Sequence, residues 1–338
     1  MRLGKILFFA VVALIVLLCV AISATIGWRP FFGPNARPLT SRKIDITPER
    51  LARGYYIFNS LSGCADCHSE HDGGSFASPL APGMTGAGAE MALDGLPGRI
   101  VAPNLTPDRE TGSGTWTDDQ LARAIREGVG HDGRALFPIM PYQHYRSMSD
   151  EDLASVVAYL RALPAVHHEL PKTEIIFPVK YLIRTVPIPV TAAVTAPDPK
   201  DQLKYGAYLV NLGGCIDCHT PADDKGNPLP GLDYAGGEVF SGKGFHAVAT
   251  ANITPDPSGI SYYDEAMFIQ VIRTGAVGAR TLSGIMPYEF YKGLTDDDLK
   301  AMFADLKTLK PVHHRVDNTA AATFCKICRK THGAGEQN

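Results

Sequence analysis

The chain carries almost no excess of charge of either sign, with 35 acidic and 32 basic side chains among 338 residues. Such a balance excludes the broadly basic surface by which proteins bind nucleic acid. The sequence also lacks sustained alternation of apolar and polar residues, which excludes an architecture of long β-strands. Long helices are disfavoured over most of the chain, because 33 glycines and 25 prolines interrupt it. What is left is an all-α fold of short helices and long loops, whose core needs a bound group to fill it.

A long apolar run is present at the N-terminus. Arg2 and Lys5 precede an uncharged, mostly apolar stretch at 6–28, which is long enough to cross about 30 Å of hydrocarbon as a helix. A signal peptide cut near residues 21–23 is the alternative, but the length favours a retained anchor with Trp28 at the far interface. Both interpretations predict export. The positive N-terminal end places the rest of the chain on the periplasmic side of the inner membrane.

The two halves of the chain repeat each other. Residues 50–68 correspond to 201–219, with Gly54 opposite Gly206 and two pairs of cysteines in register. Four further blocks match in the same order: PNLTPD with ANITPD, IREG with IRTG, IMPYQHY with IMPYEFY, and SDEDLASVVAYLRALPAVHH with TDDDLKAMFADLKTLKPVHH. The sequence therefore predicts two copies of one domain. The predicted divisions are an anchor or signal at 1–30, a linker at 31–46, domains at 47–170 and 198–316, a Pro-rich linker at 171–197 and a tail at 317–338.

Capping residues locate three helices in each copy. Thr47-Pro48 and Asp198-Pro199 each place a cap before a proline, which predicts a helix entering the cysteine motif. Residues 117–120 have capping-box form and predict a second helix ending near Gly128. The third is predicted at 149–163, with an acidic first turn and apolar residues at helical spacing.

The cysteine pairs belong to the motifs Cys64-Ala65-Asp66-Cys67-His68 and Cys215-Ile216-Asp217-Cys218-His219. A C-x-x-C-H sequence is typical of covalent attachment of c-type haem, with the histidine as proximal ligand of the iron. A zinc site would pair its two C-x-x-C units across about 15–20 residues, far less than the separation here. A thioredoxin-like pair requires a βαβ setting, and a structural disulfide explains neither the histidine nor the repetition. The prediction is two covalently bound haem c groups.

The repeat also selects the second axial ligands. Met140 and Met286 occupy matching Ile-Met-Pro-Tyr segments, whereas the other methionines that follow the first haem motif lack such counterparts. The prolines that follow favour an extended methionine, which suits a loop presenting its sulfur to a haem face. Core packing is the alternative for any methionine. Two His/Met irons would favour electron transfer over the binding of small molecules.

Other recurring residues carry weaker predictions. Arg126 and Arg273 are candidates for binding haem propionates, with a solvated arginine at a helix end as the equal alternative. For His167-His168 and His313-His314, cations at a helix C-terminus are favoured over bis-histidine ligation. The simpler interpretation of the paired tyrosines is domain core rather than haem contact. These tyrosines are Tyr142, Tyr288, Tyr145 and Tyr291.

Two segments outside the repeats are unusual. The linker is apolar, and packing against the domains is favoured over a docking strip for a partner. The tail holds Cys325 and Cys328, but Arg329 stands where a haem motif requires histidine. A local disulfide is the mild interpretation in an oxidising compartment, and metal binding with His332 is half a site. We assign the pair no function from the sequence.

On these motifs both halves resemble class I cytochrome c domains. Residues 47–316 are more closely similar to the cytochrome c subunits of membrane-bound periplasmic alcohol, aldehyde and gluconate dehydrogenases, in the N-[LI]-T-P-D segment, the G-x-W before the second helix and the MPY loop. The resemblance implies axial pairs His68/Met140 and His219/Met286. Those subunits generally carry three haem domains, whereas this sequence has two, and residues 261–263 depart from G-x-W.

The expected function is electron transfer between a periplasmic dehydrogenase, or another donor, and quinone, a cytochrome or a terminal oxidase. In this interpretation the chain is not itself an enzyme and no residue is catalytic. A dihaem enzyme with one open iron, such as a peroxidase or a sulfur-compound oxidoreductase, is the alternative, and a matching methionine in each half argues against it. A third interpretation is a protein that anchors a partner complex, with haem as its structural core.

Overall fold

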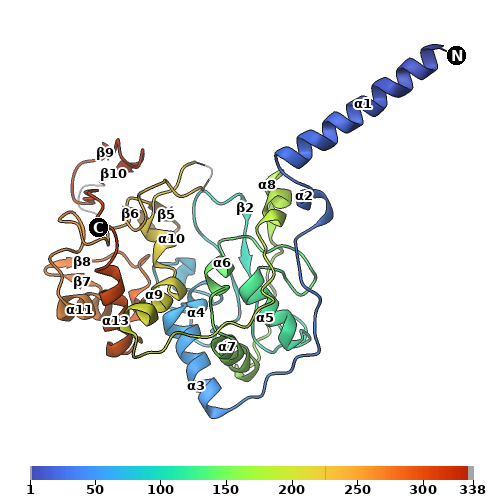
Figure 1. Cartoon of the computed structure of the whole chain (residues 1–338). Helices are drawn as coiled ribbons and strands as arrows, with labels where there is room; N and C mark the ends of the chain where they lie inside the picture. Colours follow the sequence, from blue (N-terminus) through green and yellow to red (C-terminus); the bar gives the residue numbers. More distant parts are fainter. Residues whose placement is uncertain (1, 225, 334–338) are drawn as a thin grey trace.

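A lone apolar helix, α1 (Arg2–Ala24), projects from the body of the protein (Figure 1). The computed structural model describes residues 2–224 and 226–333. By length and composition α1 can cross a membrane, and a signal sequence passes the same test. It ends four residues before Trp28, which precedes the short helix α2 (Arg29–Phe32).

The body is built mainly of short helices joined by loops. In its first half the helices after α2 are α3 (Pro48–Tyr56), α4 (Cys64–Cys67), α5 (Asp118–Glu127), α6 (Tyr142–Tyr145) and α7 (Asp150–Ala162). The second half has the same order: α9 (Gln202–Leu212), α10 (Cys215–His219), α11 (Glu265–Thr274), α12 (Tyr288–Tyr291) and α13 (Asp296–Leu306). Single turns lie at η2 (Asp72–Gly74), α8 (Val179–Leu182) and η3 (Ile183–Thr185).

Most of the predicted caps are confirmed. Thr47 accepts a hydrogen bond from the Arg50 backbone N–H, and Thr117 forms a full capping box with Gln120. Gly128 ends α5 with φ 71°, a left-handed conformation that glycine adopts without strain. The prediction at Asp198 is wrong, because α9 begins three residues after Pro199 and its cap is Asp201. The Asp198 carboxylate instead accepts from the Lys200 backbone N–H in a turn before the helix.

The fold is not purely helical. Within the described residues ten short strands form five two-stranded antiparallel ladders. The pairs are β1 (Ala89–Glu90) with β3 (Val101–Ala102), β2 (Gly98–Arg99) with β4 (Glu174–Ile175), β5 (Val239–Gly242) with β6 (Phe245–Ala249), β7 (Ala276–Val277) with β8 (Arg280–Thr281), and β9 (Thr323–Phe324) with β10 (Thr331–His332). Strands of two to five residues are too short to show the alternation from which strands are predicted.

In each half the helix before the cysteine motif crosses the last helix at a glycine. A Cβ added at Gly54 would lie 2.0 Å from the Ser155 carbonyl oxygen, and one at Gly206 would lie 2.0 Å from that of Ala301. Glycine therefore lets α3 approach α7, and α9 approach α13, with backbone against backbone.

The two halves differ in length by one residue in this region. Ten positions separate Gly54 from Cys64, but nine separate Gly206 from Cys215. The extra residue is taken up by a π-helical turn, η1 (Ile57–Leu61), between α3 and α4. Both the glycine crossing and the cysteine motif thereby keep equivalent places, and Tyr56 becomes the counterpart of Tyr208.

One hydrophobic core runs through both halves. It includes Phe58, Leu121 and Leu160 from the first half together with Leu209 and Leu299 from the second. The packing of the two halves is thus partly apolar, and the surface buried between them belongs to the core.

The linker at 171–197 is divided between packing and exposure. Ile175 pairs with Gly98 in the β2–β4 ladder, and Ile183 is 7% exposed. Phe177, in contrast, is 77% exposed and lies two residues before α8, which packs against α2 near the base of α1 (Figure 1). Packing therefore describes only part of the linker.

Candidate functional site

Each cysteine motif forms one helical turn that begins after a left-handed glycine. Gly63 has φ 54° and Gly214 has φ 64°, so the chain turns sharply into α4 and α10. All four motif thiols are half-buried, and burial raises the pKa of Cys64, Cys215 and Cys218 to about 12. The pKa of Cys67 is raised by burial as well. These thiols are neutral and face the interior of the protein.

The two motif histidines are held in one tautomer. Nδ1 of His68 lies 2.9 Å from the Pro103 carbonyl oxygen, and Nδ1 of His219 lies 2.7 Å from that of Ala251. Because a carbonyl can only accept, each Nδ1 carries the proton and donates it. Burial lowers the pKa of both imidazoles, so Nε2 keeps a free lone pair. A neutral imidazole anchored at Nδ1 in this way is suited to bind a metal through Nε2.

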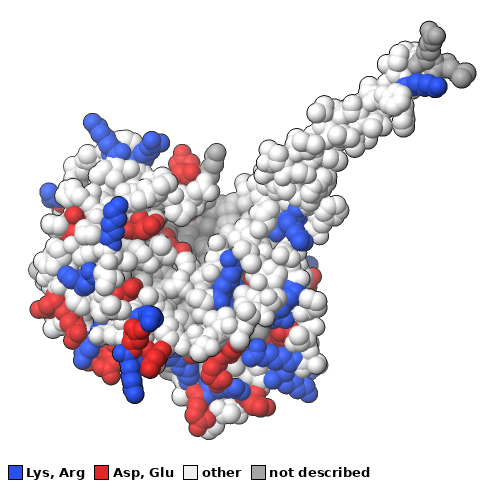
Figure 2. Space-filling view, in the orientation of Figure 1, with Lys and Arg blue, Asp and Glu red and all other residues white. Residues whose placement is uncertain are grey.

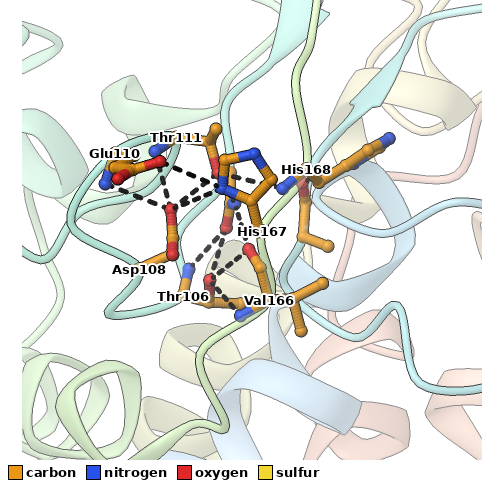
Figure 3. Close-up of polar contacts among 9 residues, drawn as sticks. Thr106, Asp108, Glu110, Thr111, Val166, His167 and His168 are labelled. Atoms are coloured by element: carbon orange, nitrogen blue, oxygen red, sulfur yellow. Dashed lines mark hydrogen bonds and ion pairs between the residues drawn. The ribbon is translucent and has the colours of Figure 1, made fainter.

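A polar network fixes the loop that supplies the Pro103 carbonyl. Nδ2 of Asn104 donates to the Val166 carbonyl oxygen at 2.8 Å, and the Val166 backbone N–H donates to Thr106 Oγ1 at 3.2 Å. Figure 3 shows Thr106 of this loop joined to Val166 of the segment after α7. The second half repeats them with Asn252, Thr254 and Val312. Both segments, the loop with the N-[LI]-T-P-D sequence and the segment after the last helix, recur in the two halves of the sequence. Their spacing alone does not reveal that they bind each other.

The histidine pairs belong to the same network and do not cap helices. Helix α7 ends at Ala162, five residues before His167. The His168 backbone N–H donates to Thr111 Oγ1 at 2.9 Å (Figure 3). The ring Nδ1 of His168 lies 3.0 Å from the Ala87 carbonyl oxygen. In the second half, Nδ1 of His314 lies 3.0 Å from the Ala235 carbonyl oxygen. The prediction of helix-end cations is therefore wrong. His168 and His314 bind loop carbonyls, and the rings of His167 and His313 face loop carboxylates instead.

Met140 and Met286 have matching positions in the two halves. Each closes a turn, with its backbone N–H donating to the carbonyl oxygen of Phe137 or of Ser283, and each lies two residues before the start of a short helix, α6 or α12. Both side chains line the same large cavity as the cysteine motifs. Other methionines line it too, namely Met91, Met148 and Met302. The matched context still singles out Met140 and Met286.

This cavity has a volume of about 1800 Å³ and is lined mainly by apolar side chains from both halves. Ligand pockets usually measure about 300–1,000 Å³, so the space suits two large ligands. His68 and His219 line it, together with all four motif cysteines. Two thiols beside a neutral imidazole in an apolar cavity are the donor set of covalently attached haem, so the residues fit that group.

Arg126 and Arg273 are placed differently from the propionate prediction. Neither lines the cavity. Arg126 lies 2.6 Å from Asp150 and Arg273 2.6 Å from Asp296, at the first residues of α7 and α13. They tie the second helix of each half to the third, which opposes their carrying haem contacts.

Arg134 and Arg280 were not predicted from the sequence to be site residues. Both line the cavity and both are exposed at its edge. Each lies six residues before its Ile-Met-Pro-Tyr methionine, Met140 or Met286, so the repeat held this signal although only part of the sequence between them matches.

The paired tyrosines divide into two kinds. Tyr142 is fully buried against Gly128, as expected of core. Tyr145 and Tyr291 line the cavity, and their hydroxyls donate to the carbonyl oxygens of Ser62 and Gly213 at 3.1 and 2.6 Å. These carbonyls lie just before the left-handed glycines, so the tyrosines hold the start of each cysteine turn.

Comparisons with known proteins agree with this donor set. Residues 49–160 match the family described as cytochrome c oxidase, cbb3-type, subunit III. The chain is 31% identical to a diheme cytochrome c-type protein of Cereibacter sphaeroides over 227 residues, which cover 64% of this chain and 73% of that protein. It is 30% identical to the fructose dehydrogenase cytochrome subunit of Gluconobacter japonicus over 293 residues, covering 82% of this chain and 56% of that subunit.

A third relative is a subunit of the nicotinate dehydrogenase of Pseudomonas putida, with 34% identity over 233 residues. That match covers 65% of this chain but 18% of the relative. The chain thus spans about half or less of the length of these two dehydrogenase subunits.

Proposed function

This chain belongs to the c-type cytochromes, and we propose that it carries two haem c groups and transfers electrons between them as a relay in a membrane-bound respiratory chain. The observation that carries the proposal is that both cysteine motifs line one cavity. The proposed domains are those of the repeat, 47–170 and 198–316, joined by the shared core.

In this proposal Cys64 and Cys67 attach one haem, and Cys215 and Cys218 attach the other. His68 with Met140, and His219 with Met286, are the axial pairs. Haem iron with both axial positions filled exchanges single electrons at a raised potential. The Pro103 and Ala251 carbonyls orient the two imidazoles, and the apolar cavity walls exclude water from the irons. Arg134 and Arg280 are the proposed partners of propionates.

The partners follow from what the relatives are called. Two of them are named as subunits of dehydrogenases, one for fructose and one for nicotinate. A periplasmic dehydrogenase is therefore the proposed electron donor, and quinone, another cytochrome or a terminal oxidase is the proposed acceptor. The chain itself supplies electron transfer and not catalysis of the substrate's oxidation.

The membrane attachment is proposed from α1 and its base. Figure 2 shows α1 as a rod almost free of charged side chains, whereas the body carries both signs. Phe31 and Phe32, on α2, are exposed by 55% and 79%, and Phe177 is exposed beside α8. Two basic residues lie close by in the sequence, Lys180 on α8 and Arg184 on η3. Aromatic and basic residues are the usual anchors at a membrane interface, which supports a retained helix with the body in the periplasm.

A spectral experiment tests the proposal. Full-length protein, made with haem-maturation machinery and extracted in detergent, is expected to contain two c-type haems per chain, both low-spin, with the weak red absorption band of methionine-ligated ferric iron. Met140→Ala and Met286→Ala should each remove about half of that band and make one haem high-spin. Met91→Leu is the matched control, because Met91 lines the cavity without a counterpart in the other half.

A high-spin haem in the unmodified protein would contradict the relay. It would favour the dihaem enzyme, because an open iron can bind a substrate. Loss of the red band in Met91→Leu would instead reassign the axial ligand of the first half.

A further inference from the structure

The tail brings four potential metal ligands together outside the haem cavity. They are His314, Cys325, Cys328 and His332, and one ligand atom from each lies within 4.8 Å of all the others. Nε2 of His314 is 3.4 Å from Cys325 Sγ, and Nε2 of His332 is 3.0 Å from Cys328 Sγ. The sequence already brought Cys325 and Cys328 together with His332, and the fold adds His314 from the segment after α13.

The local backbone is shaped around the cluster. Cys325 and Cys328 lie in the turn between β9 and β10, with the Arg329 backbone N–H donating to the Cys325 carbonyl oxygen at 2.9 Å. Arg329 itself has φ 61°, a left-handed conformation that is uncommon for a residue other than glycine. The chain therefore curls tightly so that both thiols face the same side as His332 on β10.

Burial distinguishes this cluster from a chance gathering on the surface. His314 is fully buried, Cys328 is 1% exposed and His332 is 7% exposed. Gly237 makes the close approach possible, because a Cβ there would lie 2.5 Å from Cε1 of His314 and 3.1 Å from Nε2 of His332. Next to the cluster, Lys330 forms an ion pair with Glu238 at 2.7 Å, which holds the β9–β10 hairpin against the second half.

The first half provides an internal comparison. His168 corresponds to His314, and both use Nδ1 to bind a loop carbonyl. Nε2 of His168 faces the Glu70 carboxylate at 3.3 Å. In the second half Pro221 stands at the position of Glu70, and Nε2 of His314 faces the tail thiols instead. The equivalent histidines thus face different groups, a carboxylate in the first half and thiols in the second.

We propose that these four side chains bind a structural zinc ion, which fastens the tail to the second half. Two thiolates and two neutral imidazoles form a standard closed tetrahedral zinc set. With Zn–S near 2.3 Å and Zn–N near 2.0–2.1 Å, the edges of such a tetrahedron are about 3.3–3.8 Å, close to the contacts present here. The Ala235 carbonyl holds Nδ1 of His314 and leaves Nε2 for the metal, as carbonyls behind metal-binding histidines do.

The competing chemistry is a disulfide between Cys325 and Cys328, which an oxidising compartment allows. A disulfide explains neither buried histidine. Zinc uses all four side chains, and it protects the thiols because coordinated sulfur is a thiolate held by the metal.

The experiment measures metals and thiols on full-length, haem-loaded protein purified without chelator or added metal. Elemental analysis is expected to give one zinc per chain in addition to the haem iron, which is counted separately as pyridine haemochrome. Cys325→Ser and His332→Ala should each lower zinc at least tenfold while leaving the haem content unchanged. His168→Ala is the matched control, since it removes the equivalent histidine of the first half and should keep the zinc.

A variant that fails to fold would lose haem as well as zinc, so a second measurement is made on unmodified protein. Denatured protein is titrated with a thiol reagent, with and without a strong chelator. Cys19 in α1 contributes one reactive thiol in every sample. Two further reactive thiols, released together with one zinc, support the site. A mass two hydrogens lower, showing a Cys325–Cys328 disulfide, overturns it, and so do two further free thiols without metal. Neither result bears on the haem spectra, so this inference and the proposed relay fail independently.

Discussion

The side chain of His144, in the first half, binds two residues of the second half. Its Nε2 lies 2.7 Å from the Asp217 carboxylate, inside the second cysteine motif, and its Nδ1 lies 3.0 Å from Asn211 Oδ1. Comparing the two halves of the sequence could not find this contact, because the counterpart of His144 is Phe290. Residues that recur were recognised from the repeat, whereas a residue that acts once, at the junction between the copies, leaves no pattern to compare.

This pair predicts a pH-dependent stability. The hydrogen bond to Asp217 raises the pKa of His144 above its usual value, against the opposing effect of burial. A raised pKa in the folded state means that the contribution is complete below the unfolded pKa of about 6.5 and is lost as the pH rises through the folded pKa. His144→Gln should therefore lower the melting temperature more at about pH 6 than at about pH 9.

The control for that prediction is His246→Gln, because His246 is exposed. Its melting temperature should differ from the unmodified protein by the same small amount at both pH values. An equal loss for His144→Gln at both pH values would show that the charge on the imidazole contributes nothing.

At the scale of elements, the sequence predicted helices better than it predicted loops. Side chains that cap helices, such as Thr117 and Ser149, act within one turn and can be identified from a few residues. Asp198 has the same form but caps a turn instead, because Asp201 competes for the helix start. The π-turn η1 takes up the one extra residue between Gly54 and Cys64. This need becomes clear only in the structure, where the glycine and the cysteine motif occupy equivalent places in both halves.

Those fixed positions predict the effect of filling a helix crossing. Gly206→Ala would place a Cβ 2.0 Å from the Ala301 carbonyl oxygen, so α9 and α13 must separate. Overpacking costs about 1–3 kcal/mol, which outweighs the roughly 1 kcal/mol that alanine gains in helix propensity. We expect a net loss of up to about 2 kcal/mol in the free energy of unfolding, measured by urea titration.

Gly54→Ala should behave in the same way, because its Cβ would meet the Ser155 carbonyl oxygen at the same distance. Ala52→Ser is the control on the exposed side of α3 and should cost no more than about 0.5 kcal/mol. Increased stability in either glycine variant would show that the helices are not in backbone contact.

At the scale of the whole molecule, the two halves exchange equivalent hydrogen bonds. The Tyr208 hydroxyl donates to Asp152 at 2.6 Å and accepts from the Ser149 backbone N–H at 3.0 Å. Its counterpart Tyr56 donates to Asp298 at 2.5 Å and accepts from the Thr295 backbone N–H at 3.1 Å. Each half thus binds the first turn of the other half's last helix. The repeat predicted two copies but gave no sign of this reciprocal pairing, because a contact between copies leaves no internal period.

The reciprocal pairing and the shared core predict that the halves stay together without the linker. A specific protease site inserted after Ala192, in an exposed part of the linker, should be cut without loss of either haem. The two fragments should then elute together in size-exclusion chromatography in detergent, because the core of one half is completed by the other.

The double variant Tyr56→Phe and Tyr208→Phe tests whether the reciprocal hydrogen bonds hold the two halves together. Each tyrosine hydroxyl donates to a carboxylate, and hydrogen bonds to charged groups contribute about 1.5–3 kcal/mol. Removing both should make the cut fragments separate at lower urea than the cut parent, while the uncut variant keeps its haem spectrum. If the cut parent itself separates in the absence of urea, the two halves are independent domains and the core between them adds no cohesion. Co-elution up to the same urea concentration in both proteins would instead assign the cohesion to apolar packing alone.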